Sequence, residues 1–364
     1  MLKNTMLKKM VIFSLIVFAG IFLFPANLGT VNGVLKPNMI EVAGHELYIV
    51  EGAVISVYSL NDLQLIRQFG RDGEGPGELK VVPYYNNRVS VFPDFILAES
   101  VDKLIYFSKE GAVIKQVKKP VESGFFTPVG KNFVGKKVKR DPGQKTTFIV
   151  IVLYDLELHE IKELYRQKFA QQVSGRNVTI QLFVDLVNFQ VWDNKIFIEK
   201  SPEGFLIDVF DHNGKALYQI KREYEKTKIT GAHKEAAIKE IKEDPTIKRR
   251  IKQFGSWENL LKMMKFTFPE FMPAIQYMEI ADGRIYARTF QKKNNKEEYI
   301  VIDLEGKMLR RTYIPRVHPL SLKDQLIGVK MAVIRNDKLY YLKENEEQEV
   351  WQLHVYEINQ AVIQ

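Results

Sequence analysis

The sequence predicts an all-β fold: a six-bladed β-propeller with a small α-helical insert and an N-terminal signal peptide or signal-anchor helix. Three observations predict it. One strand–strand–turn–strand unit recurs six times, a further strand can be placed before most of these units, and an uninterrupted apolar segment precedes all of them. Four strands per unit are typical of a propeller blade, whereas a solenoid would show a more constant period than this chain does.

The chain begins with a basic stretch followed by an apolar run. Three lysines precede residues 10–24, which contain no charged residue. This layout is typical of a secretory signal. The run has roughly 15 residues, fewer than the roughly 20 that span a bilayer. Ala26 fits the position directly before a cleavage site. Phe24 would stand two residues earlier, at position −3, where a small residue is preferred and a bulky one fits poorly. An uncleaved anchor formed by residues 10–24 therefore stays an alternative. We assign residues 1–29 to this segment and residues 30–364 to the propeller, and expect a periplasmic or cell-surface location.

Each repeat unit contains a strand with an aromatic or aliphatic core, a second strand, an acidic or glycine-containing turn, and a third strand. The cores of the first strands lie at residues 47–49, 95–97, 133–134, 196–198, 285–287 and 339–341. Turn pairs such as Asn213-Gly214 supply the positive φ that tight hairpins require. The sixth unit lacks an outermost strand. We therefore expect residues 30–35 to complete it and close the ring, because an open ring would leave two sheet edges unpaired.

Composition excludes some classes of site and leaves others open. The chain has no cysteine, which excludes disulfides, cysteine-ligated zinc and a cysteine nucleophile. The formal net charge is +9, of which three lysines of the apolar leader account for +3. The remaining excess fits an anionic partner or solubility alone. We expect a monomer that contacts the membrane only through the leader. We expect no nucleic-acid partner, because the leader directs the chain outward.

A glycine-rich loop, QFGRDGEGPGEL, occupies residues 68–79 between the first two units. A phosphate-binding loop would need Gly-Lys-Ser/Thr at the start of a helix, and Glu78 stands there instead. Two interpretations stay open: a structural turn between blades, or a turn that also lines a binding face through Arg71, Glu74 and Glu78.

This loop and the blade pattern resemble the exported bacterial six-bladed β-propeller proteins related to NHL repeats. The family signature, "FG…G.GPGE" followed by proline, is matched by Phe69-Gly70, Gly73, residues 75–78 and Pro83. The resemblance extends over most of residues 31–360. It implies the propeller fold and an envelope location, and it implies no catalytic residue.

The β pattern is interrupted by an insert at about residues 222–268. Residues 233–243 are good helix formers, Asp244-Pro245 reads as a helix N-cap followed by proline at the first helical position, and Ser256 can cap a third helix at residues 257–265. Residues 266–275 (FTFPEFMPAI) lead back into the fifth unit. Their prolines and aromatics predict a ligand-facing strip, with Phe268 and Phe271 as its contact residues.

Recognisable reaction chemistry is absent from the motifs. The six histidines never show the i, i+4 spacing of a helical zinc site, and no Gly-x-Ser-x-Gly elbow occurs. Glu99, Glu199 and Glu279 each follow an apolar run, so they either cap strands or meet in the central channel. The leading hypothesis is a binding or interaction module for a protein, peptide or glycan of the envelope, with no catalytic residue, metal ligand or cofactor assigned. The alternative is a metal-assisted hydrolase, lactonase or lyase that uses the channel.

Overall fold

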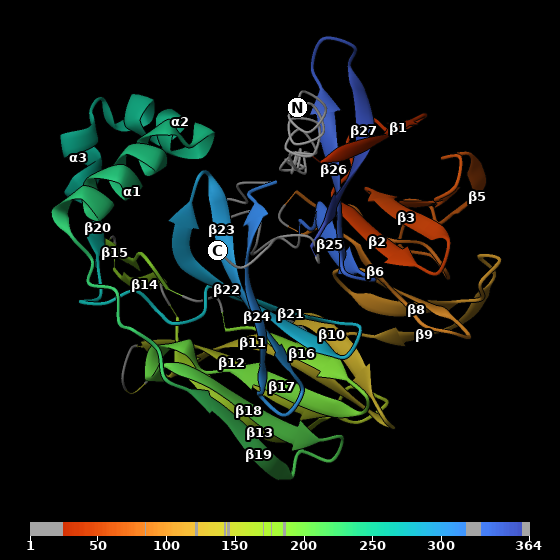
Figure 1. Ribbon diagram of the computed structural model, residues 1–364, viewed down its shortest axis with the longest axis horizontal. Helices are drawn as coiled ribbons and strands as arrows, with labels where there is room; N and C mark the ends of the chain where they lie inside the picture. Colours follow the sequence, from red (N-terminus) through yellow and green to blue (C-terminus); the bar gives the residue numbers. More distant parts are fainter. Residues whose placement is uncertain are drawn as a thin grey trace, which may run out of the picture.

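β-Strands dominate the chain, and a short helical segment lies at one edge of the sheets (Figure 1). The computed structural model describes residues 25–358 except 84, 121–122, 142, 144–145, 170, 176, 185–186 and 318–328. The predicted signal or anchor run at residues 10–24 lies outside the described residues.

The described residues form six antiparallel four-stranded sheets. Five of them follow the chain order: β2–β5 (Met39–Ala43, Glu46–Glu51, Val54–Ser59, Leu65–Phe69), β6–β9 (Arg88–Val91, Ile96–Glu99, Lys103–Phe107, Val113–Lys118), β10–β13 (Ser123–Val129, Asn132–Asp141, Thr146–Tyr154, Glu160–Lys168), β16–β19 (Phe189–Trp192, Lys195–Glu199, Phe205–Asp211, Ala216–Arg222) and β21–β24 (Tyr277–Ala281, Arg284–Lys293, Lys296–Asp303, Met308–Pro315). The sixth has the order β1-β27-β26-β25, with bounds Ala26–Val31, Val350–Glu357, Lys338–Asn345 and Ala332–Arg335. Repeated four-stranded sheets are the architecture that the sequence repeat predicts.

A strand from the start of the chain completes the sixth sheet, but its position differs from the predicted residues 30–35. β1 pairs antiparallel with β27, from Ala26 opposite Val355 to Val31 opposite Trp351. The strand therefore begins inside the range assigned to the export segment. It ends at a turn in which Gly33 has a φ of +80°. The Tyr58 hydroxyl fixes this turn by donating a hydrogen bond to the carbonyl oxygen of Asn32 at 2.9 Å, so the residues that follow cannot continue the ladder.

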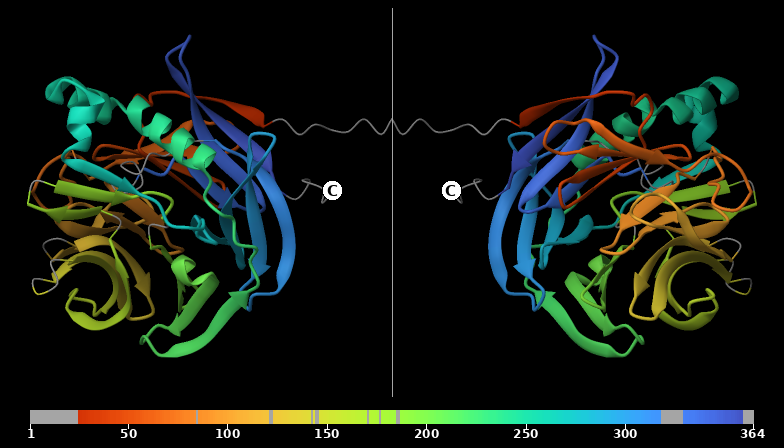
Figure 2. Two further views of the ribbon diagram at one scale, coloured as in Figure 1. Left: turned by 90° about the vertical axis from the view of Figure 1, so that its left-hand side faces the viewer. Right: turned by 90° about the vertical axis from the view of Figure 1, so that its right-hand side faces the viewer.

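The hydrophobic core consists of clusters between consecutive sheets. One such cluster joins each sheet to the next along the chain. A sixth joins the last sheet to the first, where Val31, Val34 and Ile40 pack with Val333 and Leu353. Because inner strands are buried on both faces, they read as nearly continuous apolar runs in the sequence. The array of sheets therefore closes on itself. Figure 2 shows the strand near the start of the chain, in red, beside the strands near its end, in blue.

The acidic turn of the repeat has a defined structural role. In three sheets, one carboxylate oxygen of Asp155, Asp211 or Asp303 accepts hydrogen bonds from the backbone N–H groups two and four residues further on, at 2.7–3.1 Å. A short acidic side chain satisfies the tight turn in this way. Gly306 completes the last of these turns at φ +92°, and a Cβ there would lie 2.6 Å from Ile220 of the preceding sheet. The turn thus needs glycine for both its backbone angle and its packing.

The insert forms three helices: α1 (Gly231–Glu243), α2 (Pro245–Phe254) and α3 (Trp257–Leu261). Ser256 caps α3, as predicted, by accepting a hydrogen bond from the backbone of Asn259 at 3.1 Å. The prediction of a third helix reaching residue 265 is wrong, because Met264–Thr267 forms strand β20. Among the described residues, no helix combines the length and the apolar character needed to cross a membrane.

Strand β20 belongs to a small three-stranded sheet that the repeat does not contain. It pairs in parallel with β15 (Asn177–Gln181), which pairs antiparallel with β14 (Gln171–Ser174). Pairing with a segment distant in sequence overrides the helix-forming tendency of residues 262–265. This sheet and the 3₁₀ turn η1 (Ser201–Glu203) shape the cavities described next.

Candidate ligand-binding site

The glycine-rich loop lies between β5 and β6, and it brings together the three residues predicted there. The Nε atom of Arg71 lies 2.9 Å from one carboxylate oxygen of Glu78. The other oxygen of Glu78 accepts a hydrogen bond from the backbone of Gly75 at 2.7 Å. Glu74 forms an ion pair with Lys80 at 2.5 Å. The acidic side chains thus hold the loop together, while the Arg71 side chain stays 76% exposed.

The second sheet also binds this loop. The ammonium group of Lys103 on β8 donates hydrogen bonds to the carbonyl oxygens of Glu74 and Gly75 at 3.0 and 2.8 Å. The backbone N–H of Gly77 donates to the Gln116 side chain at 3.3 Å, and a Cβ at Gly77 would collide with Val113. These contacts support the structural interpretation of the loop as a joint between the first two sheets.

The predicted strip at residues 266–275 is held firmly on both sides. The backbone of Met272 donates to the carbonyl oxygen of Thr227 at 2.8 Å, and that of Ile229 donates to the carbonyl oxygen of Glu270 at 3.0 Å. At the other end, the Ser201 hydroxyl bonds both the carbonyl oxygen and the N–H of Ile275, at 2.7 and 2.9 Å. Main-chain anchoring of this kind fixes the side chains between the two ends.

Phe271 faces a cavity of about 960 Å³, which we call the Phe271 cleft. It lies between the ends of β13, β18 and β19, the turn η1, strand β15 and residues 267–274. Its aromatic lining consists of Phe169, Phe183, Phe205, Tyr224 and Phe271. Ligand sites in proteins are characteristically concave, with apolar walls and a few placed polar groups, and this volume is large enough for a segment of a peptide or a glycan.

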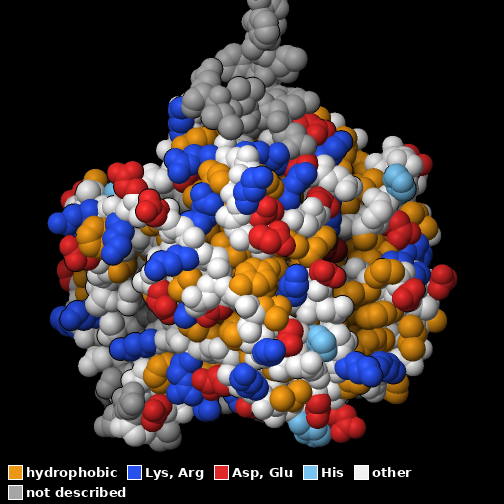
Figure 3. All heavy atoms as spheres, turned by 60° about the horizontal axis from the view of Figure 1, so that its bottom comes forward, with side chains coloured by type: hydrophobic (Ala, Val, Ile, Leu, Met, Phe, Trp, Pro, Cys, Tyr) orange, Lys and Arg blue, Asp and Glu red, His pale blue; other side chains and the backbone are white. Residues whose placement is uncertain are grey.

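The Phe271 cleft carries an excess of positive charge. Its basic lining residues are Lys168, Lys221, Arg222 and Lys226, and its acidic lining residues are Glu203 and Glu270. The ammonium group of Lys226 lies 5.7 Å from the centre of the Phe271 ring. Figure 3 shows one face of the molecule, on which acidic, basic and hydrophobic side chains are intermixed. The chemistry of the cleft therefore favours a ligand with both apolar surface and negative charge.

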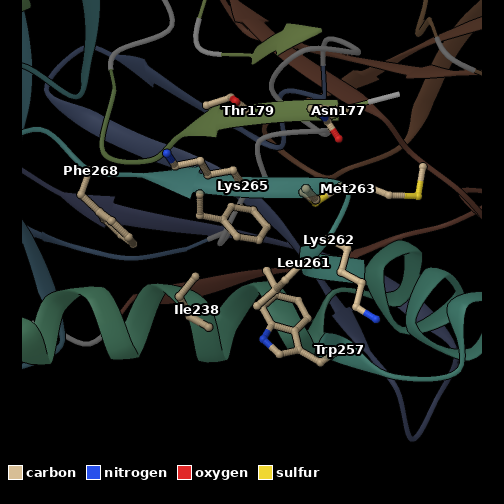
Figure 4. A pocket seen from close by; sticks show the side chains of 12 residues that line it. Asn177, Thr179, Ile238, Trp257, Leu261, Lys262, Met263, Lys265 and Phe268 are labelled. Carbon is tan, nitrogen blue, oxygen red and sulfur yellow. The ribbon is translucent and has the colours of Figure 1, made fainter. Parts of the chain in front are cut away.

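Phe268 faces a different cavity, of about 650 Å³, which we call the insert groove. It lies between helices α1 and α3 on one side and strands β15 and β20 on the other. Figure 4 shows Ile238, Leu261 and Trp257 projecting into the space between the helix and the strand. The two phenylalanines that the sequence predicts as one strip thus serve two separate cavities.

The predicted inward acids lie on three different sheets and do not form one site. Glu99, Glu199 and Glu279 are all buried. Glu99 lies 2.7 Å from Lys119, and Glu199 accepts a hydrogen bond from the backbone of Asn188 at 3.2 Å. Within the part of the chain that the structure describes, no group of three histidine or acidic residues is arranged to hold a metal ion.

A buried charge cluster instead links the first, fifth and sixth sheets. Glu41 on β2 lies 3.0 Å from Lys330 and 2.5 Å from Arg335, and Lys330 lies 3.7 Å from Glu279 on β21. Burial by itself raises the pKa of Glu41, but the charges of Lys330 and Arg335 outweigh burial, so that the pKa lies below its usual value. Glu41 was not predicted as a buried charge, although an acid flanked by Ile40 and Val42 within an apolar strand was a usable signal.

The lowered pKa of Glu41 predicts an acid-dependent loss of stability. An acid whose pKa is lower in the folded state stabilises the fold fully above its unfolded pKa, about 4.3, and loses this contribution as pH falls through the folded pKa. We expect Glu41→Gln to lower the free energy of unfolding by about 2–4 kcal/mol at pH 7 and by much less near pH 3. Urea unfolding of both proteins across this range measures the difference, and a gap that stays constant with pH would contradict the assignment.

The three-stranded sheet, which forms a wall of both cavities, was not predicted. The sequence does carry a weak signal for β15, because Val178 and Ile180 alternate with polar residues. The segment matches no repeat unit, however, and its parallel partner lies beyond the fourth sheet along the chain. Only the folded structure shows that these strands meet.

No protein-family model matches the sequence, and no curated protein shows significant sequence similarity to it. Several solved structures are similar in backbone. A member of the DUF4221 family from Bacteroides vulgatus is 12% identical, with 92% of this chain and 94% of that chain covered and a TM-score of 0.45. A protein of unknown function from Bacteroides caccae is 8% identical, with 78% and 83% covered and a TM-score of 0.39. Hsv2 from Kluyveromyces lactis is 10% identical, with 88% and 98% covered and a TM-score of 0.38.

Proposed function

We propose that this chain is an exported six-bladed β-propeller that acts as a binding module of the bacterial envelope and holds its ligand in the Phe271 cleft. The six four-stranded sheets, with a hydrophobic cluster between each consecutive pair, support the assignment of six blades in a closed ring. The basic and apolar leader and the loop of residues 68–79, which resembles that of exported NHL-related propellers, support export.

The Phe271 cleft is the observation that carries this proposal. Its walls combine aromatic faces with an excess of basic side chains, and its strip is held by main-chain hydrogen bonds on both sides. A preformed wall of this kind lowers the ordering cost of binding. The ligand it fits is a segment of an envelope peptide or glycan that carries negative charge beside an apolar or ring surface.

The buried acids favour binding over the alternative of a metal-assisted hydrolase in the channel. Glu41 is engaged by Lys330 and Arg335, and Glu279 lies 3.7 Å from Lys330. Glu99 is engaged by Lys119. A carboxylate already neutralised by a buried cation is a poor metal ligand, because binding a metal there would first require breaking the ion pair.

We expect Phe271→Ala to weaken ligand binding about tenfold or more without changing the fold, because aromatic side chains are over-represented among the few contact residues whose truncation costs about 2 kcal/mol or more. Calorimetric titration of the full chain with a panel of acidic and neutral peptides and oligosaccharides provides the measurement. Leu309→Ala is the matched control, since Leu309 is 44% exposed on the outer strand β24. Equal affinity of the Phe271 variant and the control for every panel member that binds would refute the assignment of the cleft.

A further inference from the structure

The helical insert contains few fully buried side chains, although most of its large apolar residues are partly buried. Helix α1 has no buried side chain, and across α1 and α3 the described residues contain a single buried side chain, that of Leu260. Leu261 is 41% exposed. A helix hairpin is normally stabilised by packing its apolar stripe against a core. Here Ile238 of α1 and Leu261 of α3 line the insert groove.

The floor of the insert groove is nevertheless well ordered by ring packing. The rings of Trp257 and Phe266 stack with their centres 5.8 Å apart and an interplanar angle of 8°. Phe268 packs on Phe183 at 6.1 Å between ring centres. Ile238 of α1 completes the opposite wall (Figure 4). A packed aromatic floor beside the exposed Leu261 suits a groove that receives apolar side chains of a partner.

The charged residues that line the groove are all basic, while Glu258 of α3 interacts with Lys242 nearby. The groove's charged lining residues are Lys262 and Lys265, and no lining residue is acidic. Two further ammonium groups lie over its rings, that of Lys242 at 4.9 Å from Trp257 and that of Lys234 at 5.5 Å from Phe268. The acidic Glu240 of α1 is engaged by Arg316 of the propeller at 3.6 Å. Residues 231–268 contain nine Lys and Arg against five Asp and Glu.

We propose that the insert groove binds an acidic amphipathic segment of a partner protein, at a site separate from the Phe271 cleft. Such a segment places apolar side chains on the Trp257–Phe266 floor and carboxylates against the surrounding lysines, in the helix-in-groove mode. Charge complementarity selects this occupant over a second copy of the chain, because two inserts of the same positive charge repel each other.

The probe is a synthetic peptide of about 15 residues with leucines at helical spacing and glutamates elsewhere, a length at which a helix can form on binding. Its matched control replaces every glutamate by lysine. Fluorescence anisotropy with the full chain should show binding of the acidic peptide that weakens with salt, and no binding of the basic one. Equal binding of the two peptides, or no binding of either, would overturn the proposal.

Two variants locate the site, and two more serve as controls. Leu261→Asp and the pair Lys262→Glu with Lys265→Glu should each weaken acidic-peptide binding about tenfold or more. Leu65→Asp, a change at an exposed leucine of the outer strand β5, should leave it unchanged. Phe271→Ala should also leave it unchanged, which separates failure of this proposal from failure of the proposed function. An effect of Leu65→Asp equal to that of Leu261→Asp would overturn the assignment.

Two further measurements exclude other occupants. In sedimentation, any self-association of the full chain should be the same for the wild type and for Leu261→Asp. Likewise, any binding to vesicles of phosphatidylglycerol should be the same for both proteins. A loss of either in Leu261→Asp would assign the groove to a second copy or to a lipid surface and overturn the proposal. Amide exchange in α1–α3 should slow when the acidic peptide is added, because the partly exposed helices gain the packing that they lack.

Discussion

Deletion of residues 25–36 is expected to lower the free energy of unfolding by about 5 kcal/mol or more, a large part of the stability of a typical domain. The deletion removes the ladder between β1 and β27 and leaves β27 as an unpaired edge. It also removes Val31 and Val34, which are 1% and 4% exposed in the cluster between the last and first sheets. Each buried valine contributes about 1.5–3 kcal/mol. The hydrogen bonds from Tyr58 and Trp351 to this segment are lost as well.

Thermal and urea unfolding of the full chain and the deletion variant measure this effect. Val31→Asp should reproduce a large part of it, because it places a charge in the closing cluster without shortening the chain. Leu35→Ala is the matched control, since Leu35 is 75% exposed and its loss should change stability by less than about 0.5 kcal/mol. A deletion variant that unfolds at the wild-type midpoint would show that β1 does not close the ring.

The repeated sheets could be predicted because their signals are local. Residues 47–49 and 285–287 lie in the predicted strands β3 and β22, and Asp211 and Asp303 form the predicted turns. Short apolar strand cores with turn residues at fixed places describe one blade without reference to any other part of the chain. The closing strand was predicted less well, because nothing local distinguishes Ala26–Val31 from the residues that follow. Its register is set by β27, which lies at the opposite end of the chain, and by the contact with Tyr58, which lies in the first sheet.

The cavities could be predicted only in part, because distant segments build them. Phe268 and Phe271 were identified from a proline- and aromatic-rich stretch as a ligand-facing strip, which stays a prediction; the structure places each of them at a cavity. The assignment of the two rings to different cavities depends on β20 pairing with β15, a parallel contact with no sequence signature. The basic lining of the Phe271 cleft comes from β13, β19 and the start of the insert, so only the fold brings these charges together.

Lys119→Met is expected to lower the free energy of unfolding by about 3–5 kcal/mol, because it leaves a buried carboxylate without its cation. The Lys119 side chain is fully buried, and its ammonium group lies 2.7 Å from Glu99, 2.9 Å from the Tyr85 hydroxyl and 3.0 Å from the carbonyl oxygen of Ser100. Glu99 also accepts the backbone N–H of Phe126 at the start of the third sheet. The pair therefore joins the second and third sheets, and its loss weakens that joint.

A double-mutant cycle separates the ion pair from the packing of the lysine stem. Glu99→Gln keeps an acceptor for the Phe126 N–H but removes the negative charge. The uncompensated carboxylate should cause most of the loss in the free energy of unfolding. The double variant Glu99→Gln with Lys119→Met is then more stable than Lys119→Met alone, with a coupling energy of about 2 kcal/mol or more. Additive effects would place the loss in packing instead. The cycle distinguishes the unpaired charge from the lost packing, because the methionine fills nearly the same volume in both backgrounds and only the charge on residue 99 differs.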